Sequence, residues 1–196
     1  MDRDDGSWMV NAAIQGDADA IRALWQEHRW WVATILLAHK PRQEDLEDLL
    51  QEVAMAFVKK INQLRDEEAF KPWLRTVAIN TARAAGRSVT RRKHHDARLR
   101  LHTDDRAERP DRERMNPDDR EEARWLMNLA MQLPEGYREP LLLRCVQGMS
   151  YKRISELTEL PETTIETRIA RGRRMLRELA SSQEKHINRT LSVRKP

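Results

Sequence analysis

The sequence predicts an all-α protein of two small helical domains joined by a charged flexible linker, with a helix-turn-helix in the second domain. Apolar residues recur at spacings of three and four, and clean alternating runs are absent. Only 8 prolines and 6 glycines occur among 196 residues. Between the domains the composition changes abruptly to mixed charges with little to bury. We expect domains at 7–93 and 120–180, a linker at 94–119 and a basic tail at 181–196.

The charge balance favours an anionic partner. Charged residues make up 35% of the chain, the net charge is +4, and the arginines are clustered. Nucleic acid is the commonest partner of such basic clusters. No glycine-rich phosphate loop, metal-ligand cluster or nucleophile–base spacing accompanies them. We therefore expect no catalytic residue, no metal and no cofactor.

The single cysteine and the lack of a targeting segment bear on the compartment. Cys145 has no partner for an internal disulfide, which suits a reducing environment, and its apolar neighbours predict a buried, inert thiol. The N-terminus, MDRDDGSW, lacks the apolar core of a signal peptide. The longest apolar run, Trp30 to Ala38, is too short to span a membrane. We predict a cytoplasmic protein without membrane insertion.

Three helices are expected in the first 64 residues. The first runs from Ser7 to Gln15 with Ser7 as its N-cap, and the second continues from there to Pro41. The third, Gln43 to Leu64, has the most regular apolar spacing, at Leu46, Leu49, Leu50, Val53, Phe57, Val58, Ile61 and Leu64. Its acidic start and basic end either complement the helix dipole or form a docking surface for a basic partner. That exposed polar row contains Glu47, Asp48, Gln51 and Glu52.

The segment from Phe70 to Arg87 predicts a helix with an apolar inner side and a polar outer side. Phe70 and Leu74 belong to the inner side. The outer row, at spacings of four, three and four, consists of Thr76, Asn80, Arg83 and Arg87. A basic row beside Trp73 suits phosphate contacts and base stacking. The alternative is a solvated charged face with a tryptophan in the core.

The C-terminal domain has the pattern of a helix-turn-helix packed on two further helices. The supporting helices end at Pro134 and Gly148. A short helix from Tyr151 to Thr158 then precedes a longer one that opens at Pro161. The longer helix has one narrow apolar stripe opposite hydroxyls and arginines, which suits the DNA major groove or, alternatively, a solvated helical hairpin. After Leu179 we expect a frayed polar tail.

The order of these segments resembles the bacterial sigma factors of the extracytoplasmic-function group, over nearly all of residues 8–180. GDADAIRALW, near the start, is similar to that family's opening Gly-Asp motif. DLLQEVAMAF is similar to its Asp-x-x-Gln-Glu motif, and WLRTVAIN to its Trp-Leu-x-x-Ile-Ala-x-Asn motif. The run from LPEGY to RRML resembles the domain that reads the minus-thirty-five element.

The resemblance implies a protein that binds core RNA polymerase, selects promoter DNA and helps to open it. Contact with the clamp helices of the largest polymerase subunit is implied for Glu47, Asp48, Gln51 and Glu52. Contact with the minus-ten element is implied for Phe70, Trp73, Asn80, Arg83 and Arg87. Contact with the minus-thirty-five element is implied for Tyr151, Glu162, Thr163, Thr164, Thr167, Arg168 and Arg171.

Further roles follow from the same resemblance. The link from Arg65 to Lys71 would hold a flipped base of the non-template strand. The linker would thread toward the RNA exit path, and the polymerase flap would be a second contact. Members of the family are commonly held by an anti-sigma factor, so such a protein is a possible partner.

The chain departs from the family pattern at several positions. Ala84 and Ala85 occupy the region of a usual aspartate, and Glu159 stands in the turn where glycine is common. Glu166 replaces a frequent lysine. Since glutamate can accept a hydrogen bond from cytosine, we hypothesise that Glu162 or Glu166 specifies a base.

A stand-alone helix-turn-helix regulator is the alternative function. It would use the C-terminal domain alone, with the acidic helix from Gln43 to Leu64 as a dimer or partner surface. A regulator has no need, however, of a second helical domain with its own basic and aromatic helix. Whether tight promoter binding requires polymerase separates the two functions.

Overall fold

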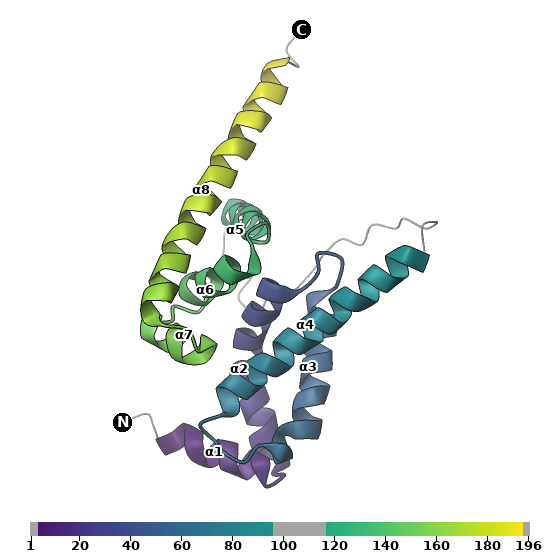
Figure 1. Ribbon diagram of the computed structural model, residues 1–196. Coiled ribbons are helices and arrows are strands. Elements are labelled where there is room, and N and C mark those ends of the chain that lie inside the picture. The colour runs from purple at the N-terminus through teal and green to yellow at the C-terminus, as the bar shows by residue number, and fades with distance from the viewer. Residues whose placement is uncertain (1–3, 96–116, 194–196) are drawn as a thin grey trace. The chain divides into compact units, whose positions relative to one another are not determined.

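The computed structural model describes residues 4–95 and 117–193, and their side chains from 7 to 87 and from 121 to 183 (Figure 1). Every regular element in these ranges is a helix. The chain divides into two units, Met1–Ala107 (unit 1) and Glu108–Pro196 (unit 2). The predicted all-α class with two helical parts is confirmed. Most of the predicted linker lies outside the described residues, and the described parts of 94–119 are helical.

Unit 1 is built around one central helix, α2 (Figure 1). Helices α1, α3 and α4 all contact α2, and α3 also packs on α4. The elements are α1 (Asp4–Ile14), α2 (Ala18–His39), α3 (Leu46–Lys60), the 3-10 turn η1 (Ile61–Gln63) and α4 (Phe70–His95). The long helix α4 therefore has a packed first half that can hold its outer side chains in place.

Aspartate side chains begin two of these helices. The Asp17 carboxylate accepts hydrogen bonds from the Asp19 and Ala20 amides, at 2.9 and 2.8 Å. The Asp45 carboxylate does the same at the start of α3. Such caps satisfy amides that have no partner within the helix. The predicted N-cap role of Ser7 is wrong, because α1 begins at Asp4 and Ser7 lies inside it.

An aromatic cluster forms the centre of unit 1. The Phe57 ring lies 6.0 Å from the Trp25 ring and 6.2 Å from the rings of Phe70 and Trp73. Phe57 is fully buried, and Phe70 is only 2% exposed. His28 meets Phe70 edge-on at 5.2 Å, and its Nδ1 lies 3.0 Å from the Leu24 carbonyl oxygen. Burial lowers the pKa of His28, because the ring charges less readily away from water.

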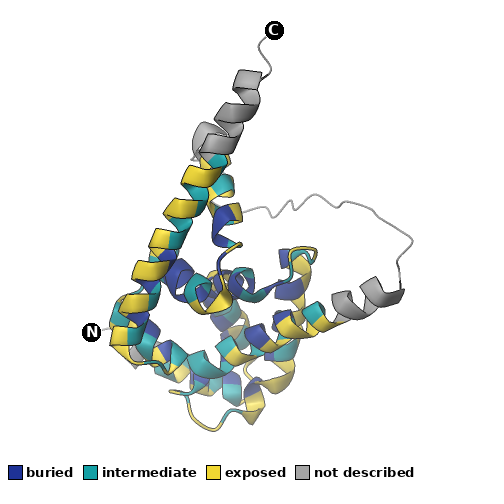
Figure 2. Cartoon of the chain, turned by 45° about the horizontal axis from the view of Figure 1, so that its top comes forward, coloured by how far each residue is buried: buried dark blue, intermediate teal, exposed yellow. Residues whose placement is uncertain are grey.

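Unit 2 is built on the helix α8, which contacts the other three helices of the unit. Its elements are α5 (Pro117–Ala130), α6 (Glu135–Cys145), α7 (Tyr151–Thr158) and α8 (Glu162–Val193). The core is aliphatic, with Leu129, Leu133, Leu143, Ile154 and Ile165 at most 1% exposed. In Figure 2 the buried residues of each unit lie on the helix sides that face neighbouring helices.

Two sequence-based expectations fail in unit 2. The tail was expected to fray after Leu179, but α8 continues to Val193. Trp125 of α5 donates a hydrogen bond from Nε1 to Gln183 Oε1 at 3.2 Å, so α8 has a partner beyond the predicted end. Cys145 is exposed rather than buried, because α6 turns Leu141, Leu142 and Leu143 inward and leaves its last residue on the outer side.

Candidate nucleic-acid interface

The turn between α7 and α8 is built without glycine. Glu159 ends α7 in the left-handed conformation, with φ 56° and ψ 33°. A residue with a Cβ adopts this conformation at a cost of roughly 1 kcal/mol. The Ser155 hydroxyl donates to the Leu160 carbonyl at 2.6 Å, and the Leu160 amide donates to the Ser155 carbonyl at 3.3 Å. These two bonds hold the turn closed, and they fix the direction in which α8 leaves it.

Helix α8 has a buried side and an exposed side over its first three turns. Ile165 and Ile169 are at most 1% exposed and face the core of unit 2. The opposite side is the α8 face, which we define as Glu162, Thr163, Thr164, Thr167, Arg168 and Arg171. Thr164 and Arg168 are half-buried at its edge, and the other four are exposed. Six of the seven predicted minus-thirty-five residues thus lie on α8 outside its buried stripe.

Tyr151, the seventh predicted residue, lies at the start of α7 and is half-buried. The Arg144 guanidinium lies over its ring, 5.2 Å from the centroid, which is cation–π geometry. Arg144 also donates from Nη1 to the Met149 carbonyl at 2.8 Å. Tyr151 is therefore held against the α6–α7 connection.

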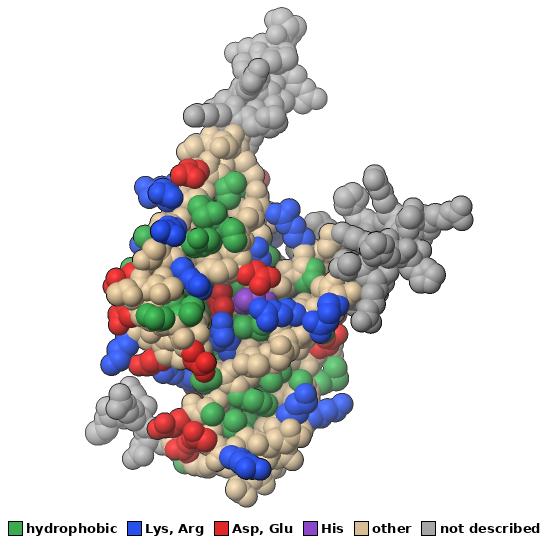
Figure 3. Space-filling model, in the orientation of Figure 1, with side chains coloured by type: hydrophobic (Ala, Val, Ile, Leu, Met, Phe, Trp, Pro, Cys, Tyr) green, Lys and Arg blue, Asp and Glu red, His purple; other side chains and the backbone are tan. Residues whose placement is uncertain are grey.

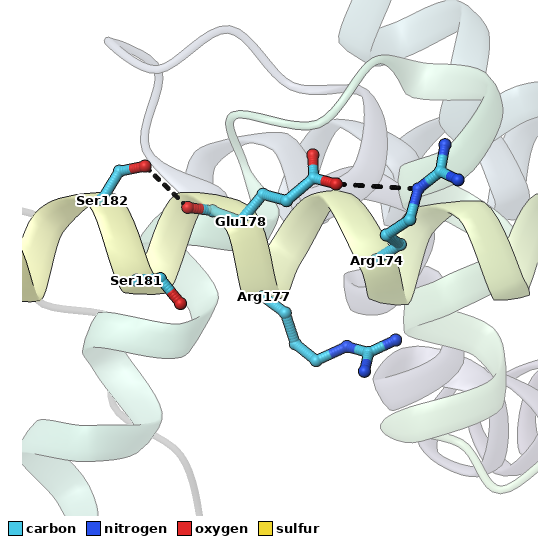
Figure 4. Close-up of a pocket in the computed structure, with 5 residues that line it drawn as sticks. All are labelled: Arg174, Arg177, Glu178, Ser181 and Ser182. Carbon is cyan, nitrogen blue, oxygen red and sulfur yellow. Dashed lines mark hydrogen bonds and ion pairs between the residues drawn. The ribbon is translucent and has the colours of Figure 1, made fainter.

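The exposed charge of α8 continues beyond the predicted face. Arg173, Arg174 and Arg177 are all exposed, and Figure 3 shows Lys and Arg side chains mixed with acidic ones on the visible surface. Figure 4 shows Arg174 and Glu178 on one side of α8, joined at 3.7 Å, with Arg177 on the other side. The hollow drawn there is lined by one helix alone, so it is a shallow surface groove rather than an enclosed substrate site. Arg173 and Arg177 were not predicted as site residues, and neither stands three or four residues from Arg168 or Arg171, so helical spacing does not place them on the α8 face.

Helix α4 carries a polar row on its outer side. Thr76, Asn80, Arg83 and Arg87 are all exposed, and we name them the α4 row. Trp73 is half-buried against Phe57 and Phe70, at ring distances of 6.2 and 6.4 Å. Phe70, a predicted minus-ten residue, is 2% exposed and its ring lies inside the aromatic cluster, so its DNA contact stays a prediction.

Helix α3 presents the acidic row that the sequence predicted. Glu47, Asp48, Gln51 and Glu52 are exposed, and we name them the α3 row. Glu47 Oε1 accepts a charged hydrogen bond from Arg29 Nη2 of α2 at 2.7 Å, so one member is already paired.

The α3 row continues into two exposed apolar residues. Met55 is 54% exposed and Val58 is 56% exposed. Val58 was expected on the buried side and is not. Met55 lies seven residues after Asp48, two helical turns further along the same side, and this spacing could have revealed it. An acidic row that continues into exposed apolar side chains is typical of a protein-binding surface.

The parts of the chain that the structure describes contain no helix long and apolar enough to cross a membrane. Over the same residues, no three His, Cys, Asp or Glu side chains gather as metal ligands would.

Two family descriptions match the sequence, one in each unit. Residues 24–92 match sigma-70 region 2, and residues 123–176 match sigma-70 region 4. The first range contains the α3 and α4 rows, and the second contains the helix-turn-helix.

Curated relatives and solved structures of similar proteins cover most of the chain. The ECF RNA polymerase sigma-E factor of Haemophilus influenzae is 29% identical over 179 residues, which cover 86% of this chain and 91% of that protein. The RNA polymerase sigma factor CarQ of Myxococcus xanthus is also 29% identical, over 89% of this chain and 97% of that protein.

Two solved structures share the fold. CnrH, solved in complex with the cytosolic domain of CnrY, has a TM-score of 0.62 at 20% identity, over 90% of this chain and 97% of that one. The sigma factor RpoE of Bartonella quintana, solved with the anti-sigma factor NepR, has a TM-score of 0.59 at 19% identity, over 82% and 96%.

Proposed function

The chain belongs to the extracytoplasmic-function group of the sigma-70 family, and from this premise we propose how its two units act at a promoter. It is a sigma factor that binds core RNA polymerase and directs promoter recognition and transcription initiation. The single observation that carries this function is that region 2 and region 4 both match, each on its own folded unit. A stand-alone regulator needs only the second, so that alternative is not favoured.

The α3 row is our proposed docking site for the polymerase. Asp48, Gln51 and Glu52 point to solvent from a helix whose other side is fixed in the core. Rows of carboxylates steer and orient a basic partner, and adjacent apolar side chains add buried area. Met55 and Val58 supply that apolar area here. The partner surface we propose is the clamp helices of the largest subunit, with the polymerase flap as a second contact for unit 2.

The α4 row is our proposed contact with the minus-ten element. Arg83 and Arg87 lie one helical turn apart and suit two phosphates, while Asn80 suits a base or sugar. Trp73 has one side against the aromatic cluster, so its half-exposed ring is rigidly held for stacking. The Phe70 ring packs against the Trp73 ring at 6.4 Å and makes no DNA contact in this proposal.

The α8 face is our proposed reader of the minus-thirty-five element. Glu162 and Thr163 lie in the first turn, where a recognition helix meets base edges. Arg168 and Arg171 follow further along and suit phosphates on either side of the groove. The N-terminal end of α8 also carries a partial positive charge that favours phosphate.

Three further assignments complete the proposal. Sigma factors are not an enzyme family, and we assign the chain no catalytic residue of its own. We place its action in the cytoplasm, where core polymerase works. Because the Bartonella quintana protein was solved with an anti-sigma factor, we propose that a protein of this kind also binds this chain.

Charge reversal on α3 tests the proposed docking site. In the Asp48→Lys, Glu52→Lys double variant, core polymerase should no longer be retained in a pull-down, and run-off transcription from a cognate promoter should be lost. The matched control is Glu121→Lys, Glu122→Lys in α5, which changes the net charge equally at two exposed residues of unit 2. Retention of polymerase by the α3 variant, or equal loss in both variants, would exclude the α3 row as the docking site.

A further inference from the structure

Helix α1 holds the segment that leads into α4 through one carboxylate, that of Glu67. Ser7 Oγ donates to Glu67 Oε1, and Asn11 Nδ2 donates to Glu67 Oε2. The two donors lie one helical turn apart on α1, and they are 60 and 56 residues from their acceptor in sequence. We name Ser7, Asn11 and Glu67 the α1 clamp. Figure 1 shows the segment between α3 and α4 running beside α1.

The clamp holds a segment that is also tied to the start of α4. The Asp66 carboxylate accepts from the Glu68 amide at 2.9 Å, and the Asp66 carbonyl accepts from the Ala69 amide at 3.2 Å. The Phe70 amide donates to the Glu67 carbonyl at 3.1 Å, and the Phe70 ring lies in the core. Glu67 is therefore fixed through its backbone to α4 and through its side chain to α1.

The clamp is separate from the contacts that dock α1. Val10 and Ala13 are 6% and 0% exposed and anchor α1 through its apolar side. Asn11 is exposed and Ser7 is half-buried, so the clamp lies toward the rim of that contact. The hydrogen bonds to Glu67 cost side-chain entropy there, and no buried apolar surface offsets that cost. The contacts thus favour a role in positioning the segment over a role in stabilising the fold.

We propose that Glu67 is a positioning residue for promoter opening, and that α1 is part of the apparatus that captures the opened strand. This inference rests on the proposed function and on the expectation from the sequence that residues 65–71 hold a flipped base of the non-template strand. Glu67 holds the inner side of that segment against α1. Its outer side, with Arg65, Asp66 and Glu68 exposed, then keeps one shape for the base. Loss of the clamp loosens base capture while leaving polymerase docking and duplex recognition intact.

The test measures how far one base contributes to strand binding. Holoenzyme is titrated with a single-stranded non-template oligonucleotide spanning the minus-ten element, and with a series in which each nucleotide in turn is abasic. With the natural chain, one abasic position should weaken binding about tenfold or more, in keeping with the value of one stacked base. With Glu67→Ala, the same abasic position should weaken oligonucleotide binding by less than about threefold. The Ser7→Ala, Asn11→Ala double variant should give the same result.

Asp19→Ala is the matched control, because it removes an exposed carboxylate of unit 1 that lies outside residues 65–71 and is paired with Arg22 on its own helix. It should keep the full abasic effect. Adding Glu67→Ala to the α1 double variant should change nothing further, because both remove the same contacts.

Three outcomes in the variants would overturn the inference. The first is an unchanged abasic effect in Glu67→Ala, and the second is an equal reduction of the abasic effect in Asp19→Ala. The third is a reduced abasic effect that both clamp variants show only together with weaker polymerase binding or a lower melting temperature. That result would indicate that the clamp stabilises the fold. If the natural chain forms no holoenzyme, the proposed function itself fails. If its holoenzyme binds duplex promoter but ignores every abasic site, only the clamp inference fails.

Discussion

The two units hold an exposed helix face in place by different means. Unit 1 packs aromatic rings around Phe57. Asp17 and Asp45 cap two of its helices, and Asp66 bonds the turn before α4. Unit 2 packs aliphatic side chains and passes through a turn in which Glu159 occupies the left-handed conformation. Unit 1 therefore depends on a few large side chains, and unit 2 contains a backbone position that its sequence does not favour. We therefore expect truncation of a core side chain to lower the stability of unit 1. In unit 2, a substitution at the turn should raise stability.

Truncation of the aromatic cluster should give the largest effect. Phe57→Ala removes the ring that contacts Trp25, Phe70 and Trp73. We expect the unfolding free energy of unit 1 to fall by about 3–5 kcal/mol, measured by hydrogen exchange of α2 and α4 amides. Phe57→Leu should lose less, since it keeps most of the buried volume. A loss of less than about 1 kcal/mol in Phe57→Ala would show that the ring contacts do not organise the unit.

A change of base preference should come next. Glu162→Ala removes an exposed acceptor from the first turn of α8. We expect relaxed preference at one base pair of the minus-thirty-five element, by about 1–3 kcal/mol. A randomised-promoter selection with holoenzyme measures it, with Glu178→Ala, four turns further along α8, as the control. An unchanged preference would rule out base reading by Glu162.

Substitution in the turn between α7 and α8 should raise the stability of unit 2, whereas core truncation lowers that of unit 1. Glu159→Gly places the residue with no Cβ at φ 56°, and we expect unit 2 to gain about 0.5–1 kcal/mol in unfolding free energy. Glu159→Ala keeps a Cβ and should gain nothing. Thermal unfolding of the three proteins, followed by circular dichroism, gives the comparison. A loss of stability in the glycine variant would show that the Glu159 side chain, not its backbone, sets the turn.

A fall in pH should have the smallest effect, and it should lower the unfolding free energy of unit 1. Burial lowers the pKa of His28 in the folded state, so the unfolded chain binds the proton more readily. Stability is therefore full above the unfolded pKa of about 6.5 and falls as the pH drops below it. Nearby Glu27 opposes the shift and Lys71 adds to it. Denaturant unfolding between pH 5 and pH 8 should show this slope, and His28→Phe should flatten it; an identical slope in that variant would assign the titration to another group.

The local parts of this fold were visible in the sequence. The helix that the sequence predicts from Tyr151 to Thr158 has the bounds of α7. The acidic α3 row and the α8 face were also found, because helical period alone places them. These are properties of residues three or four positions apart.

The parts that failed depend on distant residues. The sequence predicts a cap role for Ser7, because no local pattern shows that its acceptor, Glu67, lies 60 residues away. Cys145 and Val58 sit among apolar neighbours, and only tertiary packing decides which of these face outward. The extent of α8 depends in part on Trp125, which reaches Gln183 from another helix.

The central claim is that the two units recognise a promoter only as part of the polymerase. Fluorescence anisotropy of a labelled cognate promoter duplex, titrated with the chain alone, core polymerase alone and both together, tests it most directly. The account predicts tight binding that a scrambled duplex does not compete for, and only in the mixture of both. Equally tight and specific binding by the chain alone would contradict it.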